Sequence, residues 1–184
     1  MLNTLTMKKG ESMIYKVVVS QFTKMLENLL AILDETAKYA DEKKFDVEDL
    51  LQFRLSPDQF NLMRQLQIAC DTAKFGAARL TDTEKNAPEH VDSEKTLSEI
   101  KARIESVITY LGGFSPEDFA DSVEQRITQP RWKGKSLSGQ EYLIQHLAPN
   151  FYFHITTAYA ILRHNGVNIG KKIYLGALPY REAT

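Results

Sequence analysis

Residues 138–166 read SGQEYLIQHLAPNFYFHITTAYAILRHNG, and this stretch decides the fold. Ser138 and Glu141 have the spacing of a capping box, in which each side chain bonds the backbone amide of the other, so a helix is expected to begin there. Asn165-Gly166 is a typical helix end. Between these signals, apolar residues and one histidine recur every three or four positions: Leu143, Leu147, Phe151, His154, Ala158 and Ile161. The stretch predicts a long amphipathic helix that covers a core.

Pro149 lies inside this predicted helix. A proline has no amide hydrogen, and its ring presses on the carbonyl group four residues earlier, here that of Gln145. We therefore expect a kink, or two helical pieces that meet near this position.

Three earlier stretches have the same helical spacing and predict three further helices. Their apolar stripes are Phe22, Leu26, Leu29, Leu33 and Ala37; Met63, Leu66, Cys70, Ala73, Ala77 and Leu80; and Leu97, Ile100, Ile104, Val107 and Leu111. Ser56-Pro57 is expected to begin the second helix. Asp92 or Ser93 is expected to cap the third, and a left-handed glycine at Gly112-Gly113 to end it.

A small β-hairpin is predicted before the last helix, from residues 125–129 and 135–137, with Gly134 at positive φ in its turn. Four long helices with unequal connections predict an all-α fold, a four-helix bundle with a crossover connection. We expect residues 1–12 to be a flexible N-terminal extension and residues 13–184 to form a single domain. The apolar tail Val167–Thr184 is expected to pack across the bundle.

The composition of the chain narrows the classes of function that it can have. Across 184 residues, 23 Lys and Arg against 24 Asp and Glu give a formal net charge of −1, which disfavours nucleic acid and anionic membrane surfaces as partners. A single cysteine, Cys70, and an opening without a long apolar run favour a cytoplasmic protein. The chain has no phosphate-binding glycine loop, paired Cys-x-x-Cys or His-Glu-x-x-His motif.

The candidate site consists of polar residues within the predicted helices. Gln67 and Asp71 are four residues apart, as are Asn150 and His154, so each pair shares a helix face. If the second and fourth helices are neighbours, the two pairs converge. Asp71 could then orient His154 as a general base, or both could bind a divalent metal, while the two amides bind a small molecule. The alternative is a closed polar network, in which Asp71 accepts a hydrogen bond from His154 or a backbone amide, and Gln67 pairs with Asn150.

The remaining histidines, His90, His146 and His164, are expected to be structural, and Cys70 to be a small core residue. The hairpin region combines Arg126, Arg131, Trp132, Lys133 and Lys135. This combination is typical either of a nucleic-acid surface or of an exposed strand edge protected by lysines, and the overall charge favours the second interpretation.

The sequence resembles an uncharacterised domain-of-unknown-function branch of the DinB/YfiT-like superfamily. The resemblance spans Tyr15 to about Gly176 and is carried by NFYFHITTAYAILRHNG at 150–166, LSPD at 55–58 and QIACD at 67–71. It implies a four-helix bundle, often a homodimer, in which many members hold a divalent metal on three histidines. The corresponding positions here are Asn150, His154 and, on or near it, Gln67, so the resemblance implies that the three-histidine site is not intact.

Two functions follow as hypotheses. The first is a polar pocket between helices, formed by Gln67, Asp71, Asn150 and His154, that binds a small molecule or, through the altered site, a divalent metal. The second is a non-enzymatic homodimeric structural or interaction protein, in which the same residues form a closed core network.

Overall fold

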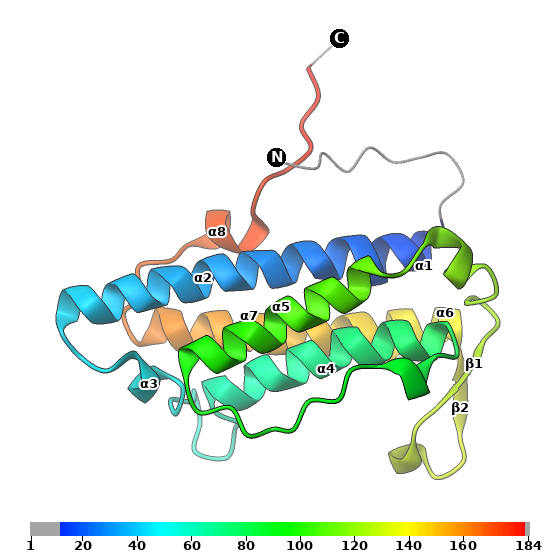
Figure 1. Ribbon diagram of the computed structural model, residues 1–184, viewed down its shortest axis with the longest axis horizontal. Coiled ribbons are helices and arrows are strands. Elements are labelled where there is room, and N and C mark those ends of the chain that lie inside the picture. The colour runs from blue at the N-terminus through cyan, green and yellow to red at the C-terminus, as the bar shows by residue number, and fades with distance from the viewer. Residues whose placement is uncertain (1–11, 183–184) are drawn as a thin grey trace.

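The computed structural model describes residues 12–182, and four long helical rods make up most of it (Figure 1). The first rod runs from α1 (Met13–Tyr15) through a π-helical turn (Lys16–Gln21) into α2 (Phe22–Lys43). The second and third are α4 (Leu62–Leu80) and α5 (Leu97–Gly112). The fourth joins α6 (Gly139–Tyr142), a π-helical segment (Leu143–Leu147) and α7 (Ala148–His164).

Shorter elements lie between the rods. These are α3 (Val47–Leu50), three 3₁₀ turns (Glu84–Asn86, Pro116–Phe119 and Pro130–Trp132), the strands β1 (Arg126–Thr128) and β2 (Ser136–Ser138), and α8 (Lys171–Leu175). The strands pair antiparallel with Ile127 opposite Leu137, and Gly134 has a φ of 82° in the turn. The predicted hairpin is therefore confirmed.

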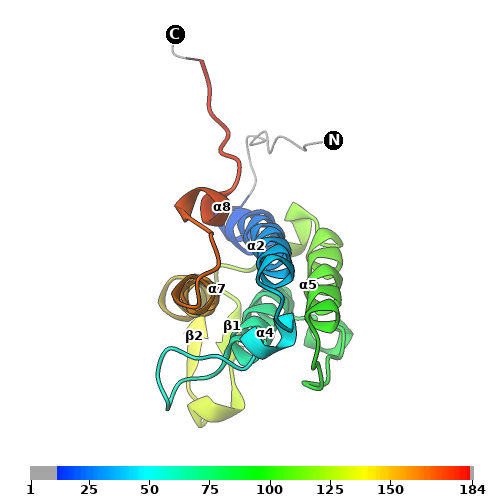
Figure 2. The same ribbon diagram turned by 90° about the vertical axis from the view of Figure 1, so that its left-hand side faces the viewer.

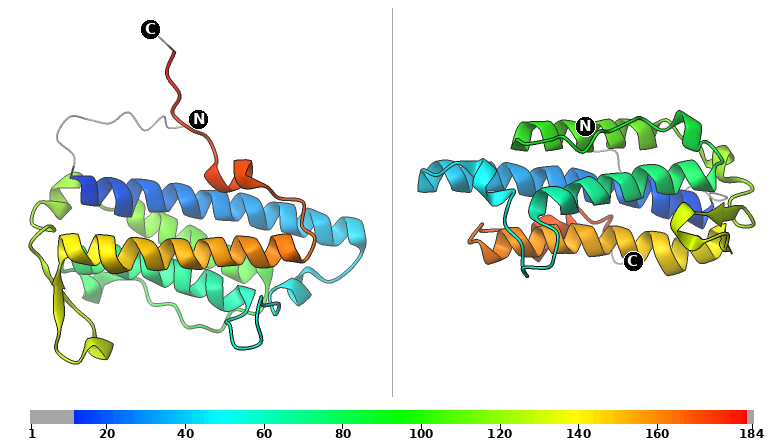
Figure 3. Two further views of the ribbon diagram at one scale, coloured as in Figure 1. Left: turned by 180° about the vertical axis from the view of Figure 1, so that it is seen from behind. Right: turned by 90° about the horizontal axis from the view of Figure 1, so that it is seen from below.

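The rods form the predicted four-helix bundle with a crossover. Viewed along the bundle, α2 lies above α4, and α7 and α5 lie on opposite sides of this pair (Figure 2). α4 and α5 run in the same direction, so the connection 81–96 has to return along the bundle before α5 begins. Views from behind and below show α7 running along α4 (Figure 3). The second and fourth predicted helices are therefore neighbours, as the candidate site required.

The core lies where the apolar stripes meet. Phe22 of α2 and Phe151 of α7 stack with ring centroids 4.0 Å apart, and both are fully buried. The stripe of α5, from Leu97 to Leu111, is buried along its whole length. Burial of such apolar surface stabilises the fold by roughly 25 cal/mol per Å².

Two predicted helix starts are wrong. Residues 56–59 form a turn in which Ser56 Oγ donates to Asp58, and α4 begins later, where Asn61 caps the amide of Arg64 at 3.0 Å. α5 begins after Thr96, which forms a capping box with Glu99, instead of after Asp92 or Ser93. Its predicted left-handed end is also absent, since Gly113 has a φ of −78°.

The last rod starts as predicted, and two helical pieces meet near Pro149, which was one of the two expected outcomes. Ser138 and Glu141 form the capping box. The π-helical segment precedes Pro149, and its last turn closes with a bond from the Ala148 amide to the carbonyl of Leu143, five residues back. A π turn is one way for a helix to accommodate a residue that has no amide donor.

The chain after α7 packs on the bundle only in part. Val167 and Ile169 are buried, and α8 is held to α2 by a hydrogen bond from Asn28 Nδ2 to the carbonyl of Tyr174 at 3.0 Å. Beyond Gly176 the chain leaves the bundle (Figure 1), so the prediction of a packed tail is wrong for residues 177–182. The predicted N-terminal extension falls outside the described residues, except for Ser12. None of the helices within residues 12–182 has the length and apolar character of a membrane span.

A substitution at Gly139 tests the packing of the last rod. A Cβ atom at this position would lie 1.7 Å from the backbone oxygen of Ser122, so Gly139→Ala forces backbone to move. We expect the free energy of unfolding to fall by about 3 kcal/mol or more. Gly112→Ala is the matched control, because nothing lies within 4 Å of its Cβ position, and a gain of about 0.4–1 kcal/mol is expected. Equal denaturant midpoints for the two variants would contradict this packing.

Candidate functional site

α4 presents polar residues on two opposite sides. Gln65 and Thr72 contact α7, whereas Gln67 and Asp71 contact α5 and the crossover connection. Successive residues of an α-helix are about 100° apart, so positions 65 and 67 are separated by about 200°. The residues of α4 that were predicted to meet α7 therefore lie on the wrong side of the helix.

His154 is buried against α4 and bonds Gln65. The distance from His154 Nδ1 to Gln65 Oε1 is 2.7 Å. Because the Gln65 amide nitrogen donates to the carbonyl of Phe60 at 3.1 Å, its oxygen accepts, and the proton of His154 lies on Nδ1. Burial, aided by the charge of Arg64, lowers the pKa of His154 to about 4. The imidazole is therefore neutral near pH 7.

Asn150 is one turn before His154 and has a partner of its own. Its Nδ2 donates to Thr72 Oγ1 on α4 at 2.8 Å. The pairing of Asn150 with Gln67 does not form.

Asp71 and Gln67 belong to a different cluster. Asp71 Oδ1 accepts from Arg103 Nη2 at 2.9 Å and lies 3.0 Å from Lys74 Nζ. Gln67 donates to Glu94 at 2.9 Å and accepts from Arg64 at 3.1 Å. The predicted convergence of all four residues is therefore wrong: the structure brings each pair to a separate set of partners.

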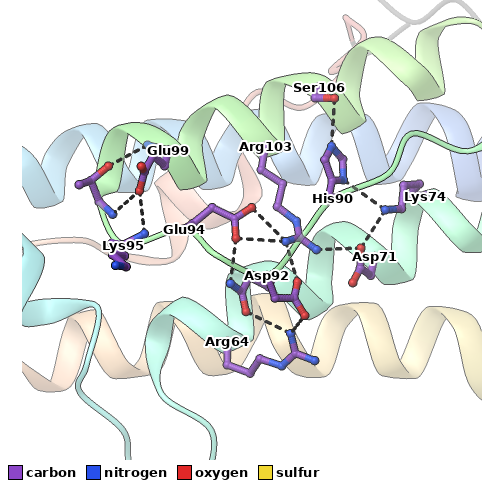
Figure 4. A network of polar contacts seen from close by, with 12 residues as sticks. Arg64, Asp71, Lys74, His90, Asp92, Glu94, Lys95, Glu99, Arg103 and Ser106 are labelled. Carbon is purple, nitrogen blue, oxygen red and sulfur yellow. Dashed lines mark hydrogen bonds and ion pairs between the residues drawn. The ribbon is translucent and has the colours of Figure 1, made fainter.

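Arg103 of α5 is the centre of this second cluster, the Arg103 network, which consists of Arg64, Asp71, Lys74, Asp92, Glu94 and Arg103 (Figure 4). Arg103 is buried, and its Nη1 donates to Asp92 at 2.8 Å and to Glu94 at 3.0 Å. Arg64 also bonds Asp92. Three cationic and three acidic side chains balance the charge of the network.

The pKa shifts confirm that ionised pairs dominate over burial in this network. Burial by itself acts to raise the pKa of Asp92, but hydrogen bonds from Arg103 and Arg64 outweigh it and lower that pKa. Burial acts to lower the pKa of Arg103, but the surrounding carboxylates raise it. These directions are those of a structural ion-pair network, which stays charged at neutral pH.

His90 extends the network along the crossover connection. Its Nδ1 lies 3.2 Å from the buried Nζ of Lys74 on α4, and its Nε2 lies 3.2 Å from Ser106 Oγ on α5. Because Lys74 donates, Nε2 of His90 carries the proton and donates to Ser106. His90 thus ties the connection to both helices, which is a structural role.

Two other predicted structural residues are held within the fold. Cys70 is fully buried, and burial raises the pKa of its thiol to about 12, as expected for a core residue. His146 stacks on Tyr142, and its Nε2 lies 2.6 Å from Nη2 of Arg131 in the hairpin. Part of the basic hairpin surface is therefore used to join the hairpin to the last rod.

The polar residues do not fit the metal site that the resemblance implies. Gln65, not Gln67, is the α4 residue opposite His154, so the site offers one imidazole and two amides. Amides are poor ligands for zinc or nickel, and Asp71 lies on the opposite side of α4. In residues 12–182, no three His, Cys, Asp or Glu side chains are grouped so that they could hold a metal ion.

Two hollows of the surface lie away from these residues. One, of about 560 Å³, is here called the aromatic groove and is lined by Tyr39, Phe45, Asp49, Leu50, Gln52, Phe53 and Asn165. The other, of about 500 Å³, lies beside α8 and is lined by Glu35, Asn168, Ile169, Gly170, Lys172, Ile173, Gly176 and Ala177. Neither includes a predicted site residue.

Sequence reasoning missed Gln65, Thr72 and Arg103. Arg103 had a signal, because it lies three residues after Ile100 and four before Val107, within the apolar stripe of its helix. A charged residue at such a position requires buried partners. Gln65 and Thr72 had no comparable signal, since polar residues occur on both sides of α4.

The comparisons agree with this architecture. The fold superposes on the crystal structure, at 1.83 Å resolution, of a DinB family member protein from Shewanella denitrificans, with a TM-score of 0.91 and 59% sequence identity over 93% of this chain and 96% of that one. The protein is thus a DinB-like helical bundle. Residues 14–175 match the family described as Domain of unknown function (DUF1993), and the chain belongs to that family. No curated protein matches the chain.

A substitution at Arg103 tests how much the Arg103 network contributes to stability. Arg103→Ala leaves three acidic side chains without their shared cation, and we expect the free energy of unfolding to fall by about 3–5 kcal/mol. Lys101→Ala is the control on the same helix, because Lys101 pairs with the exposed Asp34, and a loss below about 1 kcal/mol is expected. Urea unfolding measures both. A loss for Arg103→Ala no larger than that for Lys101→Ala would show that the network contributes little.

Proposed function

We propose that the protein is a non-enzymatic, self-associating interaction protein, whose buried polar residues stabilise the bundle. The observation that carries this proposal is that Gln67, Asp71, Asn150 and His154 each have protein partners, which belong to two separate clusters. Gln67 and His154 are buried, Asp71 and Asn150 are half-buried, and polar groups with such partners generally serve structure.

The state of His154 also supports a non-enzymatic role. A general base works best when its pKa lies near the operating pH, and that of His154 is about 4. The carboxylate that would orient it, Asp71, is instead bonded to Arg103 and Lys74. Neither residue has the partner that acid–base catalysis by this pair would need.

Exposed apolar side chains support self-association. Phe53 is 46% exposed at the rim of the aromatic groove, and Leu178 and Tyr180 are exposed in the segment that leaves the bundle. Aromatic side chains such as Phe53 and Tyr180 are enriched at protein interfaces. A second copy of this chain is the partner that we propose, and a homodimer is the simplest closed assembly.

One observation favours a second function, the binding of a small molecule or metal ion at His154. Within residues 12–182, the side-chain hydrogen bond of this histidine is made by Nδ1, so Nε2, as the unprotonated nitrogen, is available as an acceptor. Asn150, one turn away, could add an amide contact. The site would then be a binding site without catalysis.

The pKa of His154 tests the structural role. Because its pKa in the folded protein, about 4, is below the value of about 6.5 in an unfolded chain, the unfolded state binds a proton first as the pH falls. The contribution of His154 to the free energy of unfolding is therefore fully present above about pH 6.5 and is lost progressively as the pH falls toward 4. NMR titration should find His154 neutral at pH 5, with its resonance identified by its loss in His154→Gln. A pKa near neutrality would favour the catalytic hypothesis instead.

Elemental analysis separates the two functions. We expect purified protein to contain far less than one zinc, nickel, iron or manganese ion per chain, and His154→Ala to leave that content unchanged, because one imidazole with two amides binds such ions weakly. Bound metal near one ion per chain, lost in His154→Ala, would contradict the structural role and support the binding site. Asn168→Ala, at an exposed position away from the site, is the control variant.

A further inference from the structure

Two features of the surface remain without a role: the aromatic groove and residues 177–182, here called the C-terminal segment. The segment follows a defined turn at Gly176. Gly176 has a φ of 64°, and a Cβ there would lie 2.3 Å from the side-chain oxygen of Asn28. The side-chain nitrogen of Asn28 donates to the carbonyl of Tyr174. Glycine is the residue that allows this turn. The turn directs the chain away from the bundle (Figures 1 and 2).

The C-terminal segment presents large side chains that its own bundle does not cover. Tyr180 is 86% exposed and Leu178 is 41% exposed. The amide of Tyr180 bonds the carbonyl of Leu178 at 2.8 Å, which makes a three-residue turn around Pro179. A turn restrained by proline loses less conformational entropy on binding than a free chain. The segment therefore has the properties of a preformed binding peptide.

The aromatic groove has complementary properties. Its walls include the rings of Tyr39, Phe45 and Phe53, and Tyr39 and Phe45 meet edge to face. Asp49 is the one charged residue among those that line it, and its carboxylate has no hydrogen bond or ion pair within residues 12–182. Such a groove fits an aromatic or aliphatic side chain accompanied by a cation. The C-terminal segment offers Leu178, Tyr180 and the cationic Arg181.

We propose that the C-terminal segment of one copy binds in the aromatic groove of a second copy, with Tyr180 against the rings and Arg181 paired with Asp49. This inference rests on the proposed self-association and names its contact. In a twofold dimer the exchange is reciprocal, so both segments and both grooves are used.

The placement of the two features favours exchange between copies over binding within one. The segment leaves the bundle beside Asn28, whereas the groove begins at Tyr39, about 17 Å further along α2 at 1.5 Å per residue. The segment also points away from the bundle in Figures 1 and 2. It would have to turn back to reach its own groove, but not to reach that of a partner facing it.

Sedimentation equilibrium of the full chain tests the contact. Wild-type protein should form a dimer that dissociates on dilution, and Tyr180→Ala should raise the dissociation constant at least about tenfold, as for other buried aromatic contacts. Phe153→Ala, which removes an exposed ring on α7, should leave it unchanged. If a dimer forms but Tyr180→Ala does not weaken it, this contact is wrong while self-association stands. Wild-type protein that is monomeric at every concentration overturns both.

Charge reversal tests whether the exchange is between copies. Asp49→Arg and Arg181→Asp should each weaken the dimer, because each places like charges in both contacts. An equimolar mixture of the two variants should restore it, since every segment then meets a groove of opposite charge. Variants that stay monomeric when mixed, although each keeps the wild-type circular dichroism spectrum and melting temperature, would exclude this pairing between copies.

Discussion

The buried guanidinium of Arg103 is the constraint on which the architecture depends. α4 and α5 run in the same direction, so the chain between them must return along the bundle, and most of the side chains in this connection are exposed. Apolar burial therefore contributes little to holding it. Asp92 and Glu94 from the connection meet Arg103 from α5 instead, and Asp71 from α4 completes the set. The crossover is thus held mainly by ion pairs, together with the contacts of His90, and removing the shared cation leaves the carboxylates of the connection with fewer partners.

The sequence predicts the helices well because their signals are local. The capping box at Ser138 and Glu141 and the repeated apolar spacing both act within a few residues. The start of α4 was predicted too early, since Ser56-Pro57 serves equally well in a turn, and only packing of the whole chain decides between the two. The fold was therefore predictable to the level of architecture, while individual helix ends were not.

The candidate site was less predictable, for a geometric reason. Knowing that two helices are neighbours does not give the rotation of each about its own axis. α4 carries polar residues on both sides, so Gln65 was as suitable a partner for His154 as Gln67 was. The packing of the helices therefore does not decide which side chains of α4 meet His154, and the architecture alone does not define the chemistry.

The π-helical segment Leu143–Leu147 sets the angular relation between the two ends of the last rod. A π turn contains an additional residue relative to an α turn, so the part before it is rotated about the common axis. That rotation lets Tyr142 face the hairpin and His146 while Phe151 stacks on Phe22. Deleting a single residue from this segment would keep all the other side chains of the rod but turn its first part by about 100° relative to the second. One inserted residue therefore aligns the hairpin with the bundle.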